Sequence, residues 1–153
     1  MPDVNYLKDK INTKTVNFVL LSIATAGIYP IIWLTKNAPI LDEATKTPTA
    51  NHVYIIWMAV CAGLGGALGS TGEEIFDVIS LILSIALLVL YIVWAFRAKK
   101  TLSEYALKDL KMHLSMNTFY VFIFNIYYIN YCINDLPEAF RKQNLIFEPK
   151  FES

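Results

Sequence analysis

Few side chains in this 153-residue sequence combine the types and the spacing that chemistry needs. His52 and His113 have no companion at the spacing of a metal site. Cys61 and Cys132 lie 71 positions apart in apolar segments, which favours two small buried side chains over a disulfide framework or a zinc site. Neither a phosphate-binding glycine loop nor a G-x-S-x-G motif is present. We therefore expect no catalytic residue, no cofactor and no metal site, and the chain is not expected to be an enzyme.

Asp77 is the one acid set inside an apolar block. In one interpretation it marks the mouth of a polar path lined by Asn125 and Asn130. In the other, Asp77 is an acid at a helix N-terminus, where the helix dipole stabilises it by about 1 kcal/mol or less. The asparagine amides would then form hydrogen bonds across helices that hold the fold together. The second interpretation is favoured for all three residues.

The composition points to a membrane protein, because 56% of the residues are hydrophobic and only 17% are charged. A soluble domain usually has about 25% charged residues. The apolar residues form four blocks, at 16–34, 53–69, 75–96 and 116–134. A spanning helix needs about 20 residues, and the third block is long enough. The formal net charge is zero, so no nucleic acid partner is expected.

The second and third blocks predict a central transmembrane helical hairpin, because only Ser70–Glu74 lies between them. Small residues four apart let helices approach closely in lipid. We predict helix packing through four such residues, namely Gly63, Gly66, Ser80 and Ser84. Trp94, followed by Arg97, is predicted to be an interfacial anchor at the end of the third block.

The first and fourth blocks are each interrupted near the middle, and the two interruptions resemble one another. Ile28 and Ile126 are identical and lie 98 positions apart, as are Tyr29 and Tyr127. This internal repeat places turns of membrane-inserted hairpins at two sites, formed by Gly27, Tyr29 and Pro30 and by Asn125, Tyr127 and Tyr128. Trp33 and Tyr131 occupy equivalent positions and are predicted to be interfacial anchors.

The basic residues decide between two topologies. If all four blocks span, six cations lie on one side and seven on the other, which gives no bias. If the first and fourth blocks enter and leave on the same face, all 13 lie on one side and only the acidic Ser70–Glu74 turn lies on the other. The positive-inside rule favours the second arrangement. The alternative is four full transmembrane helices.

The predicted fold class is thus an all-α integral membrane protein, in which a central transmembrane hairpin is flanked by two pseudo-repeated membrane-inserted hairpins. Residues 1–153 form a single membrane domain, with cytoplasmic tails at 1–15 and 135–153. Between the third and fourth blocks, residues 98–114 predict an amphipathic surface helix, with Leu102, Tyr105 and Leu110 at helical spacing. The first apolar run continues beyond Ala24–Ala26, so a cleaved signal peptide is not expected.

The segment Ala24–Leu34 resembles the signature of a bacterial membrane family of unknown function, which has a T-x-G-I-Y-x-x-x-W pattern. The matching residues are Thr25, Gly27, Ile28, Tyr29 and Trp33. Phe122–Tyr131 resembles a second element of the same family, where a glycine often stands in the place of Asn125. The resemblance implies bacterial origin and paired elements, and it implies no activity.

Two hypotheses for function follow. The first is a non-enzymatic adaptor, assembly or immunity-type protein of the bacterial inner membrane, with both termini cytoplasmic, which acts through intramembrane contacts and shapes the bilayer. Its partners would be the lipid bilayer and a membrane protein or further copies of itself. The alternative is a small channel or transporter subunit, built around helices that are broken at membrane depth.

Overall fold

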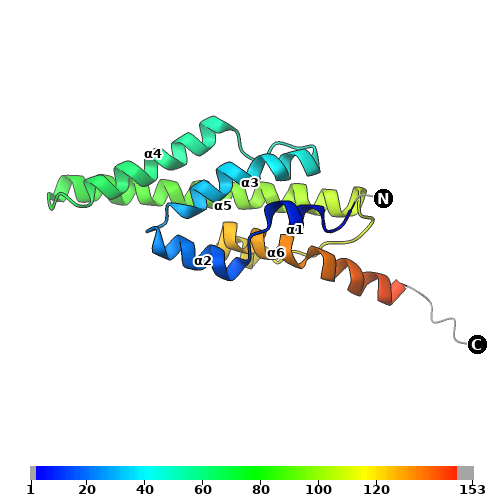
Figure 1. Cartoon of the computed structure of the whole chain (residues 1–153). Helices are drawn as coiled ribbons and strands as arrows, with labels where there is room; N and C mark the ends of the chain where they lie inside the picture. Colours follow the sequence, from blue (N-terminus) through cyan, green and yellow to red (C-terminus); the bar gives the residue numbers. More distant parts are fainter. Residues whose placement is uncertain (1–2, 148–153) are drawn as a thin grey trace, which may run out of the picture.

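The computed structural model describes residues 3–147, and this part of the chain is all-helical, without a strand. Its helices are α1 (Tyr6–Ile11), α2 (Thr15–Ala24), α3 (Tyr29–Thr45), α4 (His52–Leu68), α5 (Glu74–Lys108) and α6 (Thr118–Phe147). Figure 1 shows an elongated molecule in which the α4–α5 pair extends past all the other helices at one end.

Helices α4 and α5 form an antiparallel hairpin, and local signals set its ends. The Asn51 side chain accepts a hydrogen bond from the Tyr54 N–H at 2.8 Å and caps the start of α4. At the start of α5, Glu74 and Asp77 lie in the first turn, where the helix dipole favours negative charge. Between the helices, Gly72 has a φ of 75°, a conformation that glycine adopts without steric cost.

The chain also reverses direction between α2 and α3 and within α6. Ala26 and Gly27 have φ of 50° and 86° at the first reversal. At the second, Asn125 has φ 33° and ψ −110°, which divides α6 into a short segment over 118–124 and a long one from 126 onward. Figure 1 shows that α2 runs toward the α4–α5 turn and α3 runs back.

The buried core occupies the end of the molecule opposite the α4–α5 turn. There α1, α3, the second half of α5 and the long segment of α6 pack together. The core side chains include Leu7, Ile11, Leu34, Ala38, Leu41, Ala98, Leu102, Tyr105, Ala106, Ile133 and Leu136, all of which are buried. This end therefore has the apolar interior of a small helical bundle.

The other end has little interior, and its large apolar side chains are exposed. They lie on α2, on α4, on the first half of α5 and on residues 118–124 of α6. Examples are Val16, Leu20, Ile23, Ile56, Trp57, Leu64, Ile75, Leu81, Ile82, Phe119, Phe122 and Ile123. Within the described residues, α5 is the one helix that is long and apolar enough to cross a membrane, and α4 is apolar but shorter, at 17 residues.

Several helices extend further than the sequence predicts. Of the surface helix expected at 98–114, residues 98–108 are instead the continuation of α5, and residues 109–114 are not helical. The buried side chains of Thr101, Leu102 and Tyr105 on this continuation face the protein core. Pro39 and Pro137 lie inside α3 and α6 rather than at their ends. Each proline removes one hydrogen bond from its helix. The burial of Leu41, two residues after Pro39, and of Leu136, next to Pro137, offsets this loss, so the helices continue.

The expected terminal tails also contain helix. α1 lies within 1–15, and α6 extends through 135–147. The remainder of the predicted C-terminal tail, including Lys150, lies outside the described residues.

Candidate functional site

The residues with chemical potential do not converge on one place. Within residues 3–147, no three His, Cys, Asp or Glu side chains are grouped so that they could hold a metal ion. Cys61 on α4 and Cys132 on α6 are both buried and free.

The structure also separates the three residues considered for a polar path. Asp77 is exposed on α5 next to the α4–α5 turn, at the end that extends past the other helices (Figure 1). Asn125 is buried at the α6 break, where its Oδ1 accepts from the N–H of Ile126 at 2.6 Å. Asn130 is fully buried and donates to Thr13 and Thr15. The structure therefore does not bring Asp77 together with either asparagine.

The turn between α2 and α3 pairs its own backbone donors. The N–H groups of Ala26, Gly27 and Ile28 donate to the carbonyls of Ile23, Ser22 and Thr25. The N–H of Tyr29 donates to Thr25 Oγ1 at 2.9 Å, and the same hydroxyl donates to the Leu21 carbonyl at 2.8 Å. Pro30 has no N–H to satisfy. Thr25, Gly27 and Pro30 thus form a turn in which every backbone N–H from Ala26 to Tyr29 has a partner.

Phe18 of α2 lies at the centre of an aromatic cluster, which we define as Phe18, Tyr29, Trp33 and Tyr127. The Phe18 ring stacks on Trp33 with centroids 5.0 Å apart and an interplanar angle of 18°. It meets Tyr29 edge-on at 5.7 Å and Tyr127 at 4.9 Å. Phe18 is fully buried, so the cluster joins α2, α3 and α6 behind the turn.

The α6 break has its own polar contacts. Tyr128 Oη accepts from the N–H of Asn117 at 3.2 Å, which ties the residue before α6 to the segment after the break. Asn117 Oδ1 in turn caps α6 by accepting from the N–H of Phe119 at 2.9 Å. Tyr128 therefore holds the two segments of α6 against each other.

Two asparagines of α6 hold the segment that leads into α2. Asn130 Nδ2 donates to the Thr13 carbonyl at 3.0 Å and to Thr15 Oγ1 at 3.1 Å. Asn134 Nδ2 donates to the same carbonyl at 2.8 Å. These are cross-helix bonds of a structural kind, the interpretation that the sequence favours for Asn130.

Gly65 of α4 and Gly69 at its C-terminal end lie against α5, whereas Gly63 and Gly66 do not. Ser80 Oγ donates to the Gly65 carbonyl at 2.6 Å. A Cβ on Gly69 would lie 2.7 Å from Ser80 Oγ. Ser84 lies near Gly65. Gly63 and Gly66 instead border open space, since a Cβ on either would meet nothing within 4 Å. At about 100° per residue, Gly63 and Gly66 point to a different side of α4 from Gly65.

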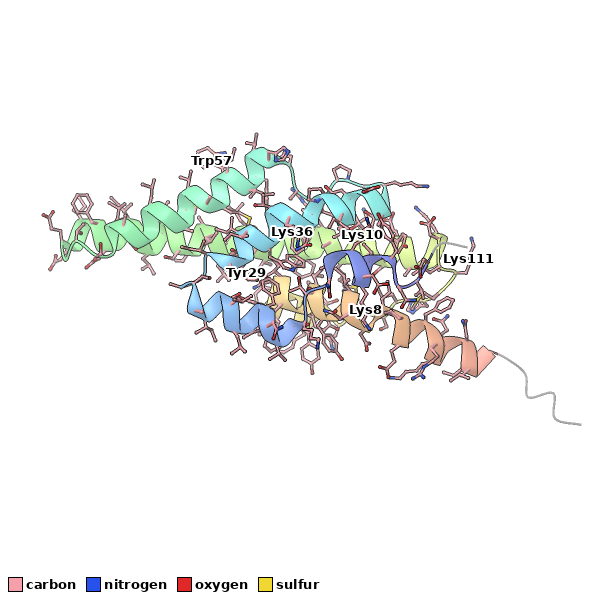
Figure 2. All side chains as sticks on the ribbon, in the orientation of Figure 1. Lys8, Lys10, Tyr29, Lys36, Trp57 and Lys111 are labelled. Atoms are coloured by element: carbon pink, nitrogen blue, oxygen red, sulfur yellow. The ribbon has the colours of Figure 1, made fainter. Side chains whose placement is uncertain are left out.

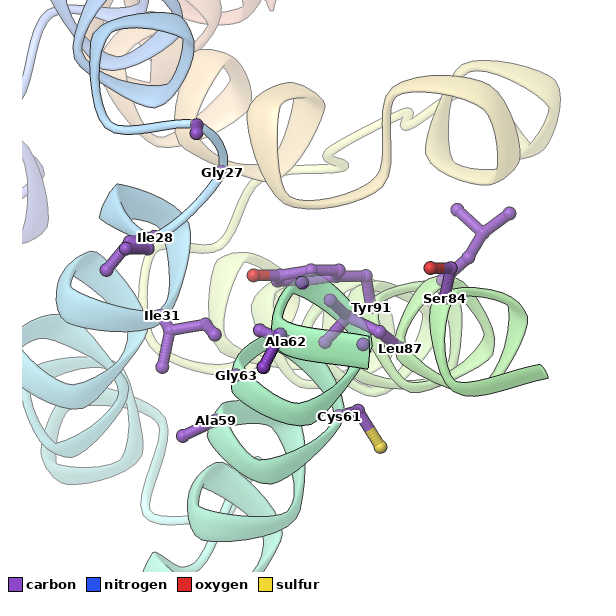
Figure 3. Close-up of a pocket in the computed structure, with 15 residues that line it drawn as sticks. Gly27, Ile28, Ile31, Ala59, Cys61, Ala62, Gly63, Ser84, Leu87 and Tyr91 are labelled. Carbon is purple, nitrogen blue, oxygen red and sulfur yellow. The ribbon is translucent and has the colours of Figure 1, made fainter. Parts of the chain in front are cut away.

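A groove of about 760 Å³ lies beside Gly63 and Gly66. It is bounded by the α2–α3 turn, by the small residues of α4 and by α5. Figure 3 shows Ile28, immediately before α3, and Ile31 of α3 on one side, with Gly63 of α4 and Tyr91 of α5 on the other. Its lining is mostly apolar, as ligand pockets of this size commonly are.

Two of the three expected interfacial anchors lie inside the protein. Trp94 is fully buried and Trp33 is 3% exposed, and their rings meet edge-on with centroids 6.1 Å apart. Their burial corrects the expectation that both face an interface, because each indole fills the core between α3 and α5. Tyr131 is 51% exposed, in keeping with a surface position.

Sequence reasoning missed Phe18 and Thr13, and it did not recognise the capping role of Thr25. The T-x-G-I-Y pattern contained a signal for Thr25, because a threonine four residues before a helix start can accept an N–H. Phe18 is one apolar residue in an apolar run, and Thr13 acts through its backbone carbonyl. Neither carries a distinguishing mark in the sequence.

Comparison with known proteins adds a family. No curated protein and no solved structure matches the chain. Residues 13–104 match the model of a domain of unknown function, DUF4234. The matched region runs from Thr13, ahead of α2, into the second half of α5. It includes Phe18, Tyr29 and Trp33 of the aromatic cluster but not Tyr127. The chain belongs to the DUF4234 family.

Proposed function

We propose that this chain is a non-enzymatic protein of the bacterial cytoplasmic membrane that acts as an adaptor, assembly or immunity-type protein. One observation carries the proposal: large apolar side chains are exposed on α2, α4, the first half of α5 and residues 118–124, all at one end of the molecule. An exposed apolar surface of this extent marks contact with lipid or with a partner.

The α4–α5 hairpin supplies the spanning element of the proposal. α5 has 35 residues and is about 52 Å long, whereas the hydrocarbon core is about 30 Å thick. Only 11% of its most apolar window is buried within the protein, and the core helix of a soluble protein would be mostly buried. We therefore assign the first half of α5 to the bilayer and the second half to the cytoplasmic bundle.

α2 and residues 118–124 supply two shallower insertions. Figure 1 shows that the α4–α5 hairpin extends beyond the α2–α3 turn, so an insertion ending at this turn reaches only part of the depth of the hairpin. Backbone in lipid must be paired internally, and the N–H groups from Ala26 to Tyr29 are all paired. This pairing supports a re-entrant hairpin over four full spans.

The charges support one orientation. Glu73, Glu74 and Asp77 lie at the α4–α5 turn. In Figure 2, the labelled lysines Lys8, Lys10, Lys36 and Lys111 lie away from this turn, alongside or beyond the core. Basic residues remain cytoplasmic in membrane proteins, so the α4–α5 turn is assigned to the periplasmic side.

This arrangement places unequal amounts of protein in the two leaflets of the bilayer. Two extra insertions occupy the cytoplasmic leaflet, while the α4–α5 turn alone reaches the other, so the protein has a wedge-shaped profile. Such a profile favours curved bilayer. The outward faces of α2 and α4 remain free in the structure, and we assign them to contacts with another membrane protein or with a further copy of the chain.

The topology is tested by cysteine labelling from outside intact cells, in a chain whose Cys61 and Cys132 are replaced by alanine. Single cysteines replace Asn12, Thr47, Thr71, Lys108 and Leu145, all of them exposed. The proposal predicts that only position 71 reacts with an impermeant maleimide. Reaction at position 47 or 108 would establish four full spans and would contradict it.

The role is tested by photo-crosslinking from Leu20 on α2 and Gly63 on α4, with Lys108 as the control position. A discrete protein adduct from the first two positions, absent at Lys108, is expected. In parallel, vesicles reconstituted with the protein should have smaller diameters than empty vesicles. Adducts to lipid alone, together with unchanged vesicle diameters, would refute the proposed role.

The channel or transporter alternative has no specific observation in its favour. Asn130 Nδ2 donates to Thr13 and Thr15, its Oδ1 is buried without a partner among the described residues, and Asp77 lies at an exposed end. Ion flux through reconstituted liposomes that disappears in Asn125→Leu would reinstate it.

A further inference from the structure

Three cations lie where helices change from exposed apolar surface to buried core. Lys14 immediately precedes α2, whose next residues include the exposed Val16. Arg97 and Lys99 follow Val93, where the series of exposed apolar residues that starts at Ile75 ends, by one to two turns. Cations at such a boundary lie at the depth of lipid phosphates if the proposed membrane insertion holds.

Hydrogen bonds connect Lys99 with the residue next to Lys14, and we call the region around these contacts and Arg97 the interfacial level. Lys99 Nζ donates to Thr118 Oγ1 at 2.5 Å, so Lys99 lies at the start of α6. The neighbouring Asn117 N–H donates to Tyr128 Oη. Two residues after Tyr128, about 3 Å of helix rise, Asn130 binds the Thr13 carbonyl next to Lys14. These contacts connect Lys99, the start of α6 and the segment that leads to Lys14.

Arg97 belongs to the same level, because it is two residues from Lys99 on α5, about 3 Å along the axis. Its guanidinium lies 5.5 Å from the centre of the Tyr54 ring, and the Tyr54 hydroxyl donates to the Leu90 carbonyl. This contact fixes Arg97 at the start of α4. A cation held over a ring face keeps its N–H donors available to an anion.

These three cations also lack carboxylate partners within the part of the chain that the structure describes. The ion pairs there are Lys108–Glu104 and Lys142–Glu138, both at the core end and both exposed. The hydrogen bond from Lys142 lowers the pKa of the Glu138 carboxyl and raises the pKa of Lys142. The interfacial level thus carries positive charge that the described acids do not pair.

We infer that Lys14, Arg97 and Lys99 together form a binding surface for the phosphate groups of anionic phospholipids in the cytoplasmic leaflet. The inference rests on the proposed function, which puts this level at the headgroups. Charge complementarity selects the partner, because zwitterionic lipids offer no net negative charge. Each basic residue near an anionic surface contributes about fivefold in affinity, so the three together give roughly 100-fold.

The test uses the full chain in nanodiscs that contain equal amounts of phosphatidylglycerol and phosphatidylcholine. The protein is extracted into detergent, and the phospholipids it retains are quantified by mass spectrometry. We expect at least tenfold enrichment of phosphatidylglycerol, roughly the square root of the full effect expected from three cations. The variant Lys14→Gln, Arg97→Gln, Lys99→Gln should show no enrichment.

A matched variant of equal charge separates this surface from general attraction. Lys8→Gln, Lys46→Gln, Lys108→Gln removes three cations at the core end and should retain the enrichment. Thr118→Ala, which removes the Lys99–Thr118 bond and keeps all three cations, should also retain it, which excludes loss of that bond as the cause. Equal loss in the core-end variant, or enrichment that persists in the first variant, would overturn the inference.

Two further measurements identify the source of the phosphate and distinguish failure of this inference from failure of the proposed function. Washing with inorganic phosphate should release no more lipid than chloride at the same ionic strength, and greater release would assign the surface to free phosphate and overturn the inference. Labelling restricted to position 71, without lipid enrichment, would refute the inference alone. Labelling at position 47 or 108 would refute both.

Discussion

Asn130 of α6 donates a hydrogen bond to the main-chain carbonyl of Thr13, 117 positions earlier in the chain, at 3.0 Å. The bond joins the two ends of the sequence at the point where α2 begins. Asn134 donates to the same carbonyl, so two amides hold one backbone oxygen. The segment that leads into α2 is thus connected directly to the long segment of α6.

Replacing Asn130 with leucine should destabilise the protein by about 1–3 kcal/mol, because the part-buried Thr15 hydroxyl loses this donor and the Thr13 carbonyl keeps only the bond from Asn134. The free energy of unfolding is measured in mixed micelles by titration with dodecyl sulfate. Asn144→Leu is the control, because Asn144 is exposed on the same helix. An equal effect of both substitutions would show that the loss does not come from this bond.

Gly27→Ala and Gly63→Ala form a matched pair, because a new Cβ meets nothing within 4 Å at either site. Gly27 has a φ of 86°, so alanine there should cost about 1 kcal/mol or more. Gly63 is helical, and alanine there should stabilise the monomer by up to about 1 kcal/mol. The same unfolding titration checks the signs, and destabilisation by both would contradict the assignment of the strain to φ.

Gly69→Ala should push α4 away from α5, because its Cβ would lie 2.7 Å from Ser80 Oγ. Overpacking of this kind costs about 1–3 kcal/mol. Gly66→Ala, next to open space, should not have this cost. Adding Ser80→Ala to Gly69→Ala should recover part of the loss, as measured by a double-mutant cycle. Strict additivity would exclude the clash as the cause.

Phe18→Ala should be the most damaging of these changes, at about 3–5 kcal/mol, because Phe18 is fully buried among three aromatic rings. Phe119→Ala removes a ring that is 65% exposed and should change the unfolding free energy by less than about 1 kcal/mol. Helix content by circular dichroism is recorded for both. A Phe18 variant as stable as the Phe119 variant would show that the aromatic cluster does not hold α2 in place.

Much of the helical organisation can be predicted from the sequence, because hydropathy and glycine positions mark it directly. The block at 53–69 predicts α4 to within one residue at each end, and the interruptions at Gly27 and Asn125 coincide with positive φ. The continuation of α5 beyond Phe96 was missed, because the cluster at Arg97–Lys100 resembles the end of a membrane segment. Charge marks a change of environment and does not end a helix.

Burial was harder to predict. Trp94 and Tyr131 both lie at the ends of apolar blocks, yet one is buried and the other is half exposed. The difference depends on Trp33, which reaches Trp94 from another helix. Likewise, the pairs Ala59/Gly63 and Ala62/Gly66 show the same spacing of four as Gly65/Gly69, and only the three-dimensional packing distinguishes the face that meets Ser80. Such pairings are tertiary facts that one sequence does not reveal.

The unbroken course of α5 from Glu74 to Lys108 has a mechanical consequence. Because α5 has no break, a force that tilts the helix near Glu74 also displaces Tyr105 and Ala106 in the bundle. A partner that tilts the α4–α5 turn would therefore also move the C-terminal end of α5. The two surfaces of the molecule are thereby linked without any rearrangement of the helix between them.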